Sequence, residues 1–234
     1  MRMSMPKNLF KREGPNMQTT FEPLKLAGTA VISDVFDSLH LLPPVFDNSL
    51  QPIGTSSTFA GPAYTITGEP IQFEGGDRAK LSAIDAMPAG IVAVWSSMDA
   101  KGVCCFGDLL ASAMRARGCV AAVVDGGVRD ASFLEQCGMH VVARYKTPAQ
   151  GIGRWRVTAS QTDVRIRGAL EEWVTVMPGD IIVGDADGVI AIPEQLLSEV
   201  TAKVIEWSRS ESGAREEIIA GLPLLAALQK YGHL

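Results

Sequence analysis

The pattern of apolar and polar positions predicts helices and strands that alternate along most of the chain. Helical spacing of apolar residues predicts a helix over 24–42, which Pro43-Pro44 would end. Residues 90–95 are apolar without a break, which is typical of a strand buried on both faces. The same pattern predicts a strand over 55–67, a polar turn over 74–77 and a helix over 78–87.

A βαβ series is the clearest part of the pattern. The strand at 90–95 is followed by a helix over 109–117, a strand over 120–124, a helix over 131–137 and a strand over 139–143. This order predicts parallel pairing of the three strands. Gly118 and Gly138 would end the two helices in the left-handed conformation. The segment Asp125-Gly126-Gly127-Val128 is predicted to turn the chain.

After residue 145 the pattern changes to short strands and then to helices. The strands are expected over 154–158, 164–166, 174–176, 181–183 and 189–192. A helix over 193–208 follows, and a last amphipathic helix over 215–231 is broken near Gly221 and Pro223. Its apolar face could pack on the protein's own core or on a neighbouring subunit (Ile218, Ile219, Leu222, Leu225 and Leu228). We expect residues 1–20 to form a flexible arm and residues 21–234 to form one α/β domain that includes these helices.

Charge and hydropathy narrow the choice of partners. The 234 residues carry a formal net charge of −5, and nucleic-acid-binding surfaces usually carry clustered positive charge. No apolar run approaches the roughly 18–20 residues that a membrane span needs. The first residues lack the apolar stretch of a secretory signal, so we expect a cytoplasmic protein without nucleic acid or membrane as a partner.

The cysteines do not have the spacing of a metal site. A zinc site needs ligand pairs a few residues apart, and the chain has no CxxC pair. We therefore expect buried, reduced thiols at Cys104, Cys105, Cys119 and Cys137.

Two aspartates begin helices that follow strands of the βαβ series. The carboxyl ends of neighbouring parallel strands meet at one edge of a sheet, so Asp108 and the pair Arg129-Asp130 are expected to lie close together. Gly107 would let a ligand approach the backbone. The helix after it would offer the amides of Leu109 and Leu110 to an anion.

These residue types suit a small keto acid. Mg²⁺ is commonly held by one or two carboxylates and several waters, as Asp108 and Asp130 could provide. The guanidinium of Arg129 suits a carboxylate or carbonyl oxygen, and cations at this point stabilise an enolate. Purely structural interpretations of these residues stay open beside that of a keto-acid site. Each aspartate could simply cap its helix, and Arg129-Asp130 could be a surface ion pair.

With these residues the chain resembles the RraA-like proteins, a family that includes 4-hydroxy-4-methyl-2-oxoglutarate aldolases acting also as oxaloacetate decarboxylases. The resemblance lies in Gly107-Asp108-Leu109-Leu110 and in Asp108 followed, after twenty residues, by Arg129-Asp130. Supporting matches extend from about residue 24 to residue 231 and include Gly61-Pro62-Ala63, Gly76-Asp77, Val124-Asp125-Gly126, Pro178-Gly179-Asp180 and Asp185-Ala186-Asp187-Gly188. The chain departs from the family at Phe133, where an acidic residue is common, and the nearest acid is Glu135.

The resemblance implies a swivelling β/β/α domain with a C-terminal helical tail, assembled as a homotrimer or homohexamer with sites between subunits. It implies catalytic roles for Arg129, Asp108 and Asp130. Asp130 would ligate Mg²⁺ or Mn²⁺ directly, and Asp108 would hold a metal-bound water. Substrate would contact Gly107, the Leu109 and Leu110 amides, and Arg129. An acidic group would arrive from a neighbouring subunit, with Glu206, Glu216 and Glu217 as candidates.

The resemblance implies a divalent-metal-dependent lyase of the class II type. It would cleave a 4-hydroxy-2-keto acid or diacid to pyruvate by a retro-aldol reaction and decarboxylate oxaloacetate through the same pyruvate enolate. The alternative is a non-catalytic regulator that binds a ribonuclease, as some members of the family do. A methyltransferase is disfavoured because the sequence lacks a glycine-rich strand–turn–helix loop with an acidic partner.

Overall fold

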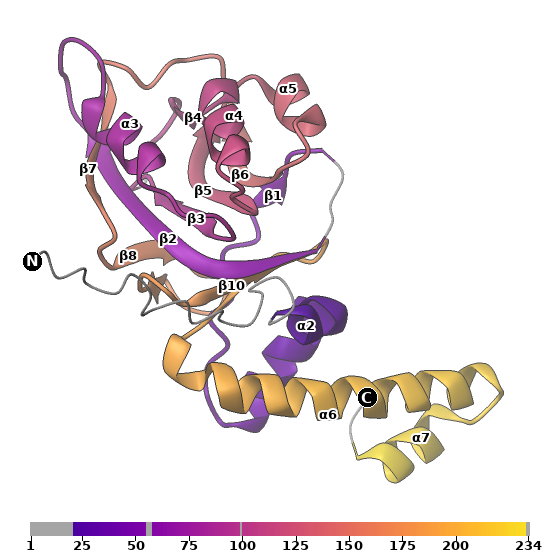
Figure 1. Ribbon diagram of the computed structural model, residues 1–234. Coiled ribbons are helices and arrows are strands. Elements are labelled where there is room, and N and C mark those ends of the chain that lie inside the picture. Colours follow the sequence, from indigo (N-terminus) through magenta and orange to yellow (C-terminus); the bar gives the residue numbers. More distant parts are fainter. Residues whose placement is uncertain (1–20, 55–57, 99, 233–234) are drawn as a thin grey trace, which may run out of the picture.

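The computed structural model describes residues 21–54, 58–98 and 100–232, and within them one bent sheet of nine strands organises the molecule (Figure 1). The strands of this sheet and of a separate hairpin are β1 (Gln51–Pro52), β2 (Phe59–Pro70), β3 (Val92–Ser96), β4 (Cys104–Phe106), β5 (Ala121–Val128), β6 (His140–Lys146), β7 (Trp155–Ser160), β8 (Val164–Arg167), β9 (Trp173–Val176), β10 (Ile181–Gly184) and β11 (Val189–Ile192). The helices are α2 (Glu22–Ser38), α3 (Arg78–Asp85), α4 (Asp108–Ala116), α5 (Ala131–Gln136), the 3-10 turn η1 (Glu194–Leu196), α6 (Leu197–Ile219) and α7 (Leu224–Tyr231).

The strand order confirms the predicted parallel series. Along the sheet the order is β1-β6-β5-β3-β2-β10-β11, with β4 paired to β5 and β7 paired to β2. Strands β2, β3, β5 and β6 pair in parallel, and β10 and β11 continue the sheet in antiparallel. The hairpin β8-β9 stands apart from this sheet.

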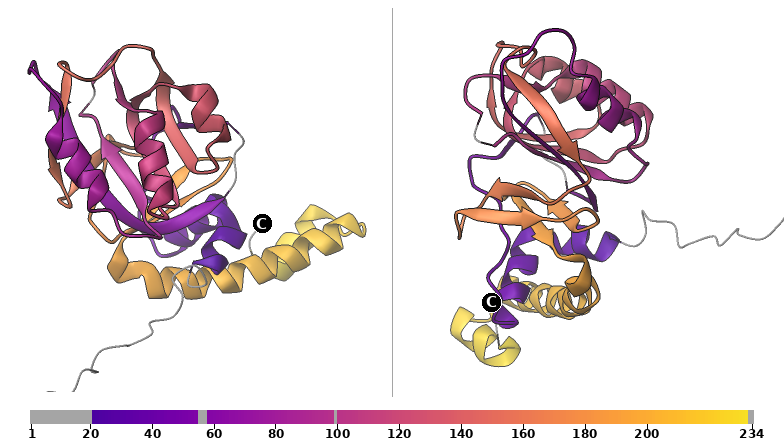
Figure 2. Two further views of the ribbon diagram at one scale, coloured as in Figure 1. Left: turned by 45° about the horizontal axis from the view of Figure 1, so that its top comes forward. Right: turned by 90° about the vertical axis from the view of Figure 1, so that its left-hand side faces the viewer.

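Three apolar cores separate the layers of the fold. One lies between the parallel strands and α3, α4 and α5, a second between the other face of these strands and β8 to β11, and a third between β10-β11 and the helices α2 and α6 (Figures 1 and 2). Strand β3 shows why its sequence has no polar face: Ala93 and Trp95 face the first core, and Val92 and Val94 face the second. This layering agrees with the expected β/β/α domain.

The segment expected to turn the chain at Asp125–Val128 is instead the second half of β5, so that prediction was wrong. Its glycines are required by close packing. A Cβ built on Gly127 would lie 2.4 Å from Cε2 of Tyr145 and 2.6 Å from the carbonyl oxygen of Val103. Paired glycines are common in turns, but here the neighbouring strand and loop leave no room for a side chain.

Strand β4 is a further difference from the predicted elements, since its three residues, Cys104–Phe106, were not expected to form a strand. Helix α2 also ends earlier than predicted, at Ser38, and it is broken at Gly28 (φ 83°). At that break Asp185 accepts hydrogen bonds from the amide (2.7 Å) and hydroxyl (2.8 Å) of Thr29. A carboxylate thus caps the second segment of α2 from the β10-β11 turn.

The C-terminal helices are divided differently from the prediction. Helix α6 continues through the segment 209–214, and α7 follows after the break at Gly221 and Pro223 (Figure 1). Helix α6 packs on α2 through Val200 and Val204. Much of the predicted apolar face of the tail does not pack on the protein's own core, because Ile219, Leu225 and Leu228 are exposed.

Gly118 and Gly138 have the predicted positive φ values after α4 and α5. The arm predicted for residues 1–20 lies outside the described residues. Among the helices of the described segments, none combines the length and apolar character needed to cross a membrane.

Replacing Gly127 tests the close packing of β5. We expect Gly127→Ala to lower the free energy of unfolding by about 1–3 kcal/mol, the usual cost of overpacking. Gly76→Ala is the matched control, since a Cβ there meets no atom within 4 Å, and its effect should stay within about 0.5 kcal/mol. Urea unfolding of both variants measures the difference, and equal effects would contradict the steric explanation.

Candidate functional site

The candidate site forms where two short parallel strands end together. Strand β4 pairs with β5 so that Phe106 lies opposite Val128, and the amide of Arg129 donates to the Phe106 carbonyl at 3.1 Å. The residues that follow each strand are therefore neighbours, namely Gly107-Asp108 and Arg129-Asp130. The structure brings them together as predicted, although β4, which the prediction lacked, provides the connection.

Asp130 has a backbone conformation that turns its carboxylate away from its own helix. It is left-handed (φ 59°, ψ 37°), and its side chain makes no capping hydrogen bond to α5. Oδ2 instead lies 3.3 Å from the amide nitrogen of Asp108, at the start of α4. The simple capping explanation for Asp130 thus fails. A left-handed non-glycine residue costs energy that the surrounding structure must supply, and such residues cluster at functional sites.

Gly107 makes this approach possible. A Cβ at Gly107 would lie 2.8 Å from Oδ2 of Asp130 and 3.3 Å from Cγ of Arg129. Any side chain here would push the carboxylate away from α4. The glycine therefore contributes to the site by leaving space for the Asp130 carboxylate, and its expected role in the approach of a ligand stays a prediction.

Arg129 and Asp130 are both partly open to solvent. Nε of Arg129 is 3.4 Å from Oδ2 of Asp130, and the two side chains are 40% and 37% exposed. An ion pair with this exposure contributes little to stability. Both groups remain accessible to a ligand.

The first turn of α4 differs from the expectation of two free amides. Asp108 is the first residue of the helix rather than its cap, and its Oδ1 accepts from the Leu109 amide at 2.7 Å. A substrate carboxylate that used the Leu109 amide would have to displace this bond. Leu109 itself is exposed, and Leu110 packs against the first core.

These groups open onto a pocket of about 230 Å³. Arg129, Gly107 and Asp108 line it together with residues from α3 and the turn before it, from β4, from the first turn of α4 and from the loop before β7 (Gly76, Asp77, Lys80, Leu81, Cys104, Cys105, Phe106, Leu109, Leu110, Gln150, Gly151 and Ile152). Asp130 is not among these lining residues; together with Arg129 it lines a second, more open hollow that includes Lys146 and Thr147.

Lys80 is a pocket residue that the sequence analysis missed. It is 8% exposed, its Nζ lies 3.9 Å from Oδ2 of Asp77, and it stands 5.0 Å over the Trp155 ring. Burial lowers the pKa of Lys80 below its ordinary value, and the nearby Asp77 carboxylate opposes that effect. The available signal was Asp77 itself, whose side chain caps α3 at the amide of Lys80.

The ionisable side chains near the site suit a hard cation with oxygen ligands better than a metal ion with thiolate ligands. No group of three or more His, Cys, Asp or Glu side chains in the described segments could hold a metal by itself. Asp108 and Asp130 give two carboxylates, which is what Mg²⁺ uses when waters complete its shell. All four cysteines are free and buried, as predicted, and burial raises the pKa of the Cys105 thiol to about 12. A thiolate ligand is therefore disfavoured.

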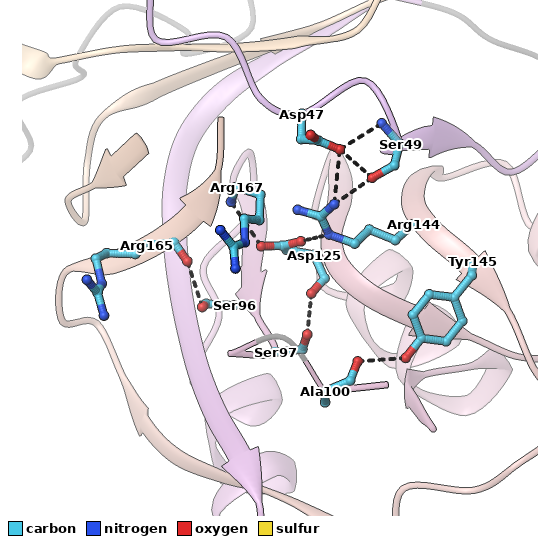
Figure 3. A network of polar contacts seen from close by, with 10 residues as sticks. All are labelled: Asp47, Ser49, Ser96, Ser97, Ala100, Asp125, Arg144, Tyr145, Arg165 and Arg167. Atoms are coloured by element: carbon cyan, nitrogen blue, oxygen red, sulfur yellow. Dashed lines mark hydrogen bonds and ion pairs between the residues drawn. The ribbon is translucent and has the colours of Figure 1, made fainter. Parts of the chain in front are cut away.

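A buried ion pair holds strand β5, which ends just before Arg129. Asp125 of β5 is 2% exposed, and its carboxylate accepts from Nε of Arg144 and from the amide of Arg167 at 3.2 Å (Figure 3). The Ser97 hydroxyl donates to the Asp125 carbonyl oxygen, and Arg144 also contacts Asp47 at 3.0 Å. These bonds tie β5 to β6, to β8 and to the end of β3.

The acidic residues considered for a neighbouring subunit lie on α6, on the other side of the β layers from α4 (Figure 1). Glu206 and Glu216 are exposed, and Glu217 pairs with Lys230 of α7. None of them lines the pocket of its own chain. Their role in a partner subunit stays a prediction.

Phe133, which stands where an acidic residue is common in the family, is 44% exposed. Glu135, the nearest acid along the chain, pairs with Lys146 at 3.3 Å. Glu135 lines neither the pocket of Arg129 nor the hollow beside Asp130.

Comparison with known proteins identifies relatives over nearly the whole chain. The family model described as RraA-like, Aldolase/RraA, matches residues 29–191. "Putative 4-hydroxy-4-methyl-2-oxoglutarate aldolase" of Halalkalibacterium halodurans is 32% identical over 88% of this chain and 91% of its own length. Protein DlpA of Legionella pneumophila is 28% identical over 94% of this chain, which spans 35% of that longer protein.

A solved structure shows the same fold. Streptomyces coelicolor RraAS2, described as an unusual member of the RNase ES inhibitor RraA protein family, superposes with a TM-score of 0.73 at 21% identity. The match covers 87% of this chain and 98% of that one.

Removing the buried carboxylate tests the support of β5. We expect Asp125→Ala to lower the free energy of unfolding by about 3–5 kcal/mol, because Arg144 would lose its buried partner and keep only the partly exposed Asp47. Asp47→Ala removes a carboxylate that is 37% exposed and should cost less than about 1 kcal/mol. Urea unfolding compares the two, and Asp125→Asn serves if the alanine variant does not fold. A cost at Asp125 no larger than that at Asp47 would overturn this assignment.

Lys80 should cost stability rather than provide it. In the folded state its pKa is lowered from about 10.5, so the unfolded chain binds more protons between the two values. Stability due to this group therefore rises as the pH increases through that window. In urea unfolding we expect Lys80→Met to be at least as stable as wild type at pH 7. At pH 10 the free energy of unfolding of wild type should have risen relative to that of the variant. A loss of about 3 kcal/mol, typical of a broken buried ion pair, would contradict this.

Proposed function

Because this chain belongs to the RraA-like family, we propose that it is a divalent-metal-dependent lyase that cleaves a 4-hydroxy-2-keto acid to pyruvate and also decarboxylates oxaloacetate. The observation that carries the proposal is the meeting of Asp108, Arg129 and Asp130 at the start of α4, beside one small pocket. The relative named as an aldolase, at 32% identity over most of both chains, supports the reaction class.

The residues of this site can bind and polarise a 2-keto acid. Arg129 would donate to the keto oxygen and to a carboxylate oxygen, in the paired geometry that a guanidinium allows. The first turn of α4 would add backbone donors and the positive end of its dipole. Gly107 would let the substrate approach this turn closely.

Both reactions place negative charge at the same atom. In the retro-aldol cleavage the C4 hydroxyl loses its proton and the C3–C4 bond breaks, so that its electron pair forms the enolate of pyruvate. In oxaloacetate the same bond breaks to release carbon dioxide. Protonation at C3 then gives pyruvate. Arg129 would stabilise the enolate oxygen, a role that fixed cationic donors perform better than water does.

Mg²⁺ or Mn²⁺ fits the donor set. Asp130 would be a direct ligand, and Asp108 would hold a metal-bound water, since both carboxylates are open to solvent in part and oxygen donors suit these ions. When bound, the cation would polarise the keto oxygen and offset the charge that develops on it. Capture of an anion then depends on these local groups, against a net charge of −5 for the whole chain.

We further propose that the protein works as a homotrimer or homohexamer, with each site completed by a neighbour. The exposed apolar residues of α6 and α7 support an assembly through this tail (Ile219, Leu224, Leu225 and Leu228). A regulator of a ribonuclease is the second candidate function, because RraAS2 is described as a member of an RNase ES inhibitor family.

An activity assay tests the proposal. Purified protein is mixed with oxaloacetate or 4-hydroxy-2-keto diacids, and pyruvate is followed with lactate dehydrogenase and NADH. We expect release with Mg²⁺ or Mn²⁺ and loss with EDTA. Asp130→Ala should abolish it, as should Asp130→Asn, which tolerates the left-handed backbone and removes only the charge. Arg129→Ala should slow it by about 10²–10³.

The outcomes separate the candidates. Pyruvate release that persists in EDTA would overturn the metal dependence. Absence of release with every substrate, together with capture of a ribonuclease by the tagged full chain, would favour the regulator.

A further inference from the structure

Lys80 is a mostly buried lysine that lines the pocket, and its ammonium has no hydrogen bond to the described residues. Lys80 lies in the first turn of α3 and is 8% exposed. The carboxylate oxygen nearest to Nζ, Oδ2 of Asp77, is 3.9 Å away, and within the described ranges Nζ donates no hydrogen bond. An ammonium has three donors, and at the wall of a pocket they are open to an acceptor that a ligand brings.

Asp77 only partly balances this charge because both of its oxygens are already engaged. Oδ1 accepts from the Lys80 amide at 3.1 Å, and Oδ2 accepts from the Val157 amide at 2.9 Å. The ring of Trp155, 5.0 Å from Nζ, favours a cation at this place without accepting a conventional hydrogen bond. The donors of Lys80 are thus held in place but not used.

Lys80 lines the same pocket as Arg129. Much of the remaining wall is apolar, with Phe106, Leu110 and Ile152 among its residues. Two cations in a small pocket with apolar walls suit a ligand that carries two separate negative groups. A carboxylate at Lys80 would supply the acceptor that the protein itself lacks there. It would also oppose the lowering of the lysine pKa by burial.

We infer that Lys80 binds the second carboxylate of the substrate, the one remote from the keto group. The inference rests on the proposed function, in which Arg129 and α4 take the 2-keto acid end. It makes Lys80 a specificity-determining residue, the group that would distinguish a 2-keto diacid from a 2-keto monoacid of the same length.

Binding of two uncleavable keto acids tests this without turnover. The full chain, saturated with Mg²⁺, is titrated by calorimetry with 2-oxoglutarate and with 2-oxopentanoate, which differ only in the second carboxylate. We expect wild type to bind the diacid at least about tenfold more tightly, as for a charge-assisted hydrogen bond. Lys80→Met keeps an unbranched side chain as far as Cε and removes only the ammonium, and it should bind both ligands with similar affinity.

Two further variants serve as controls. Lys203→Met removes one positive charge from α6, and the preference for the diacid should persist. Arg129→Met should weaken the binding of both ligands, because Arg129 contacts the 2-keto acid end that they share. Retention of the full preference in Lys80→Met would overturn the inference and leave the proposed function intact. Failure of wild type to bind either keto acid would overturn both.

Discussion

The ion pair between Asp125 and Arg144 is the interaction on which the geometry of the candidate site most depends. A carboxylate that is 2% exposed must be matched by charge and by hydrogen bonds, and its partners come from β6 and β8. Once these are in place, the last residues of β5 have one position. Strand β4 then pairs beside them, and the chain leaves both strands at the start of α4. The position of Arg129 and Asp130 thus follows from a charge buried a few residues earlier.

The sequence was sufficient for those parts of the fold in which a residue's neighbours along the chain determine its environment. The unbroken apolar run of β3 and the order of strands and helices gave the parallel sheet, and the positions of Asp108 and Asp130 gave the site at its edge. Gly127 was wrongly predicted to lie in a turn, because the residue that requires its small size, Tyr145, belongs to another strand. Strand β4 is too short to have a pattern. Lys80 has importance only because the fold buries it near Trp155, and nothing in the residues around it reports that burial.

Several energetically unfavourable features lie close together at the site. Asp130 has a left-handed backbone, Lys80 is a buried cation, and Asp130 and Asp108 bring two carboxylates to one helix start. Each of these lowers stability by itself. Lys80 and Asp108 line the pocket of Arg129, and Asp130 lies next to Arg129, an arrangement expected where folding energy is given up for binding.

The bond from the Leu109 amide to Asp108 links two events at the site. One N–H donates well to one acceptor at a time, so an anion that takes the Leu109 amide competes with the Asp108 carboxylate for it. When the anion wins, that carboxylate is released and its charge becomes available to a cation or a water. By thermodynamic reciprocity, a cation that draws Asp108 away makes the amide easier for an anion to occupy. Anion and cation would then bind cooperatively, because each of them favours breaking the same hydrogen bond between the Leu109 amide and Asp108.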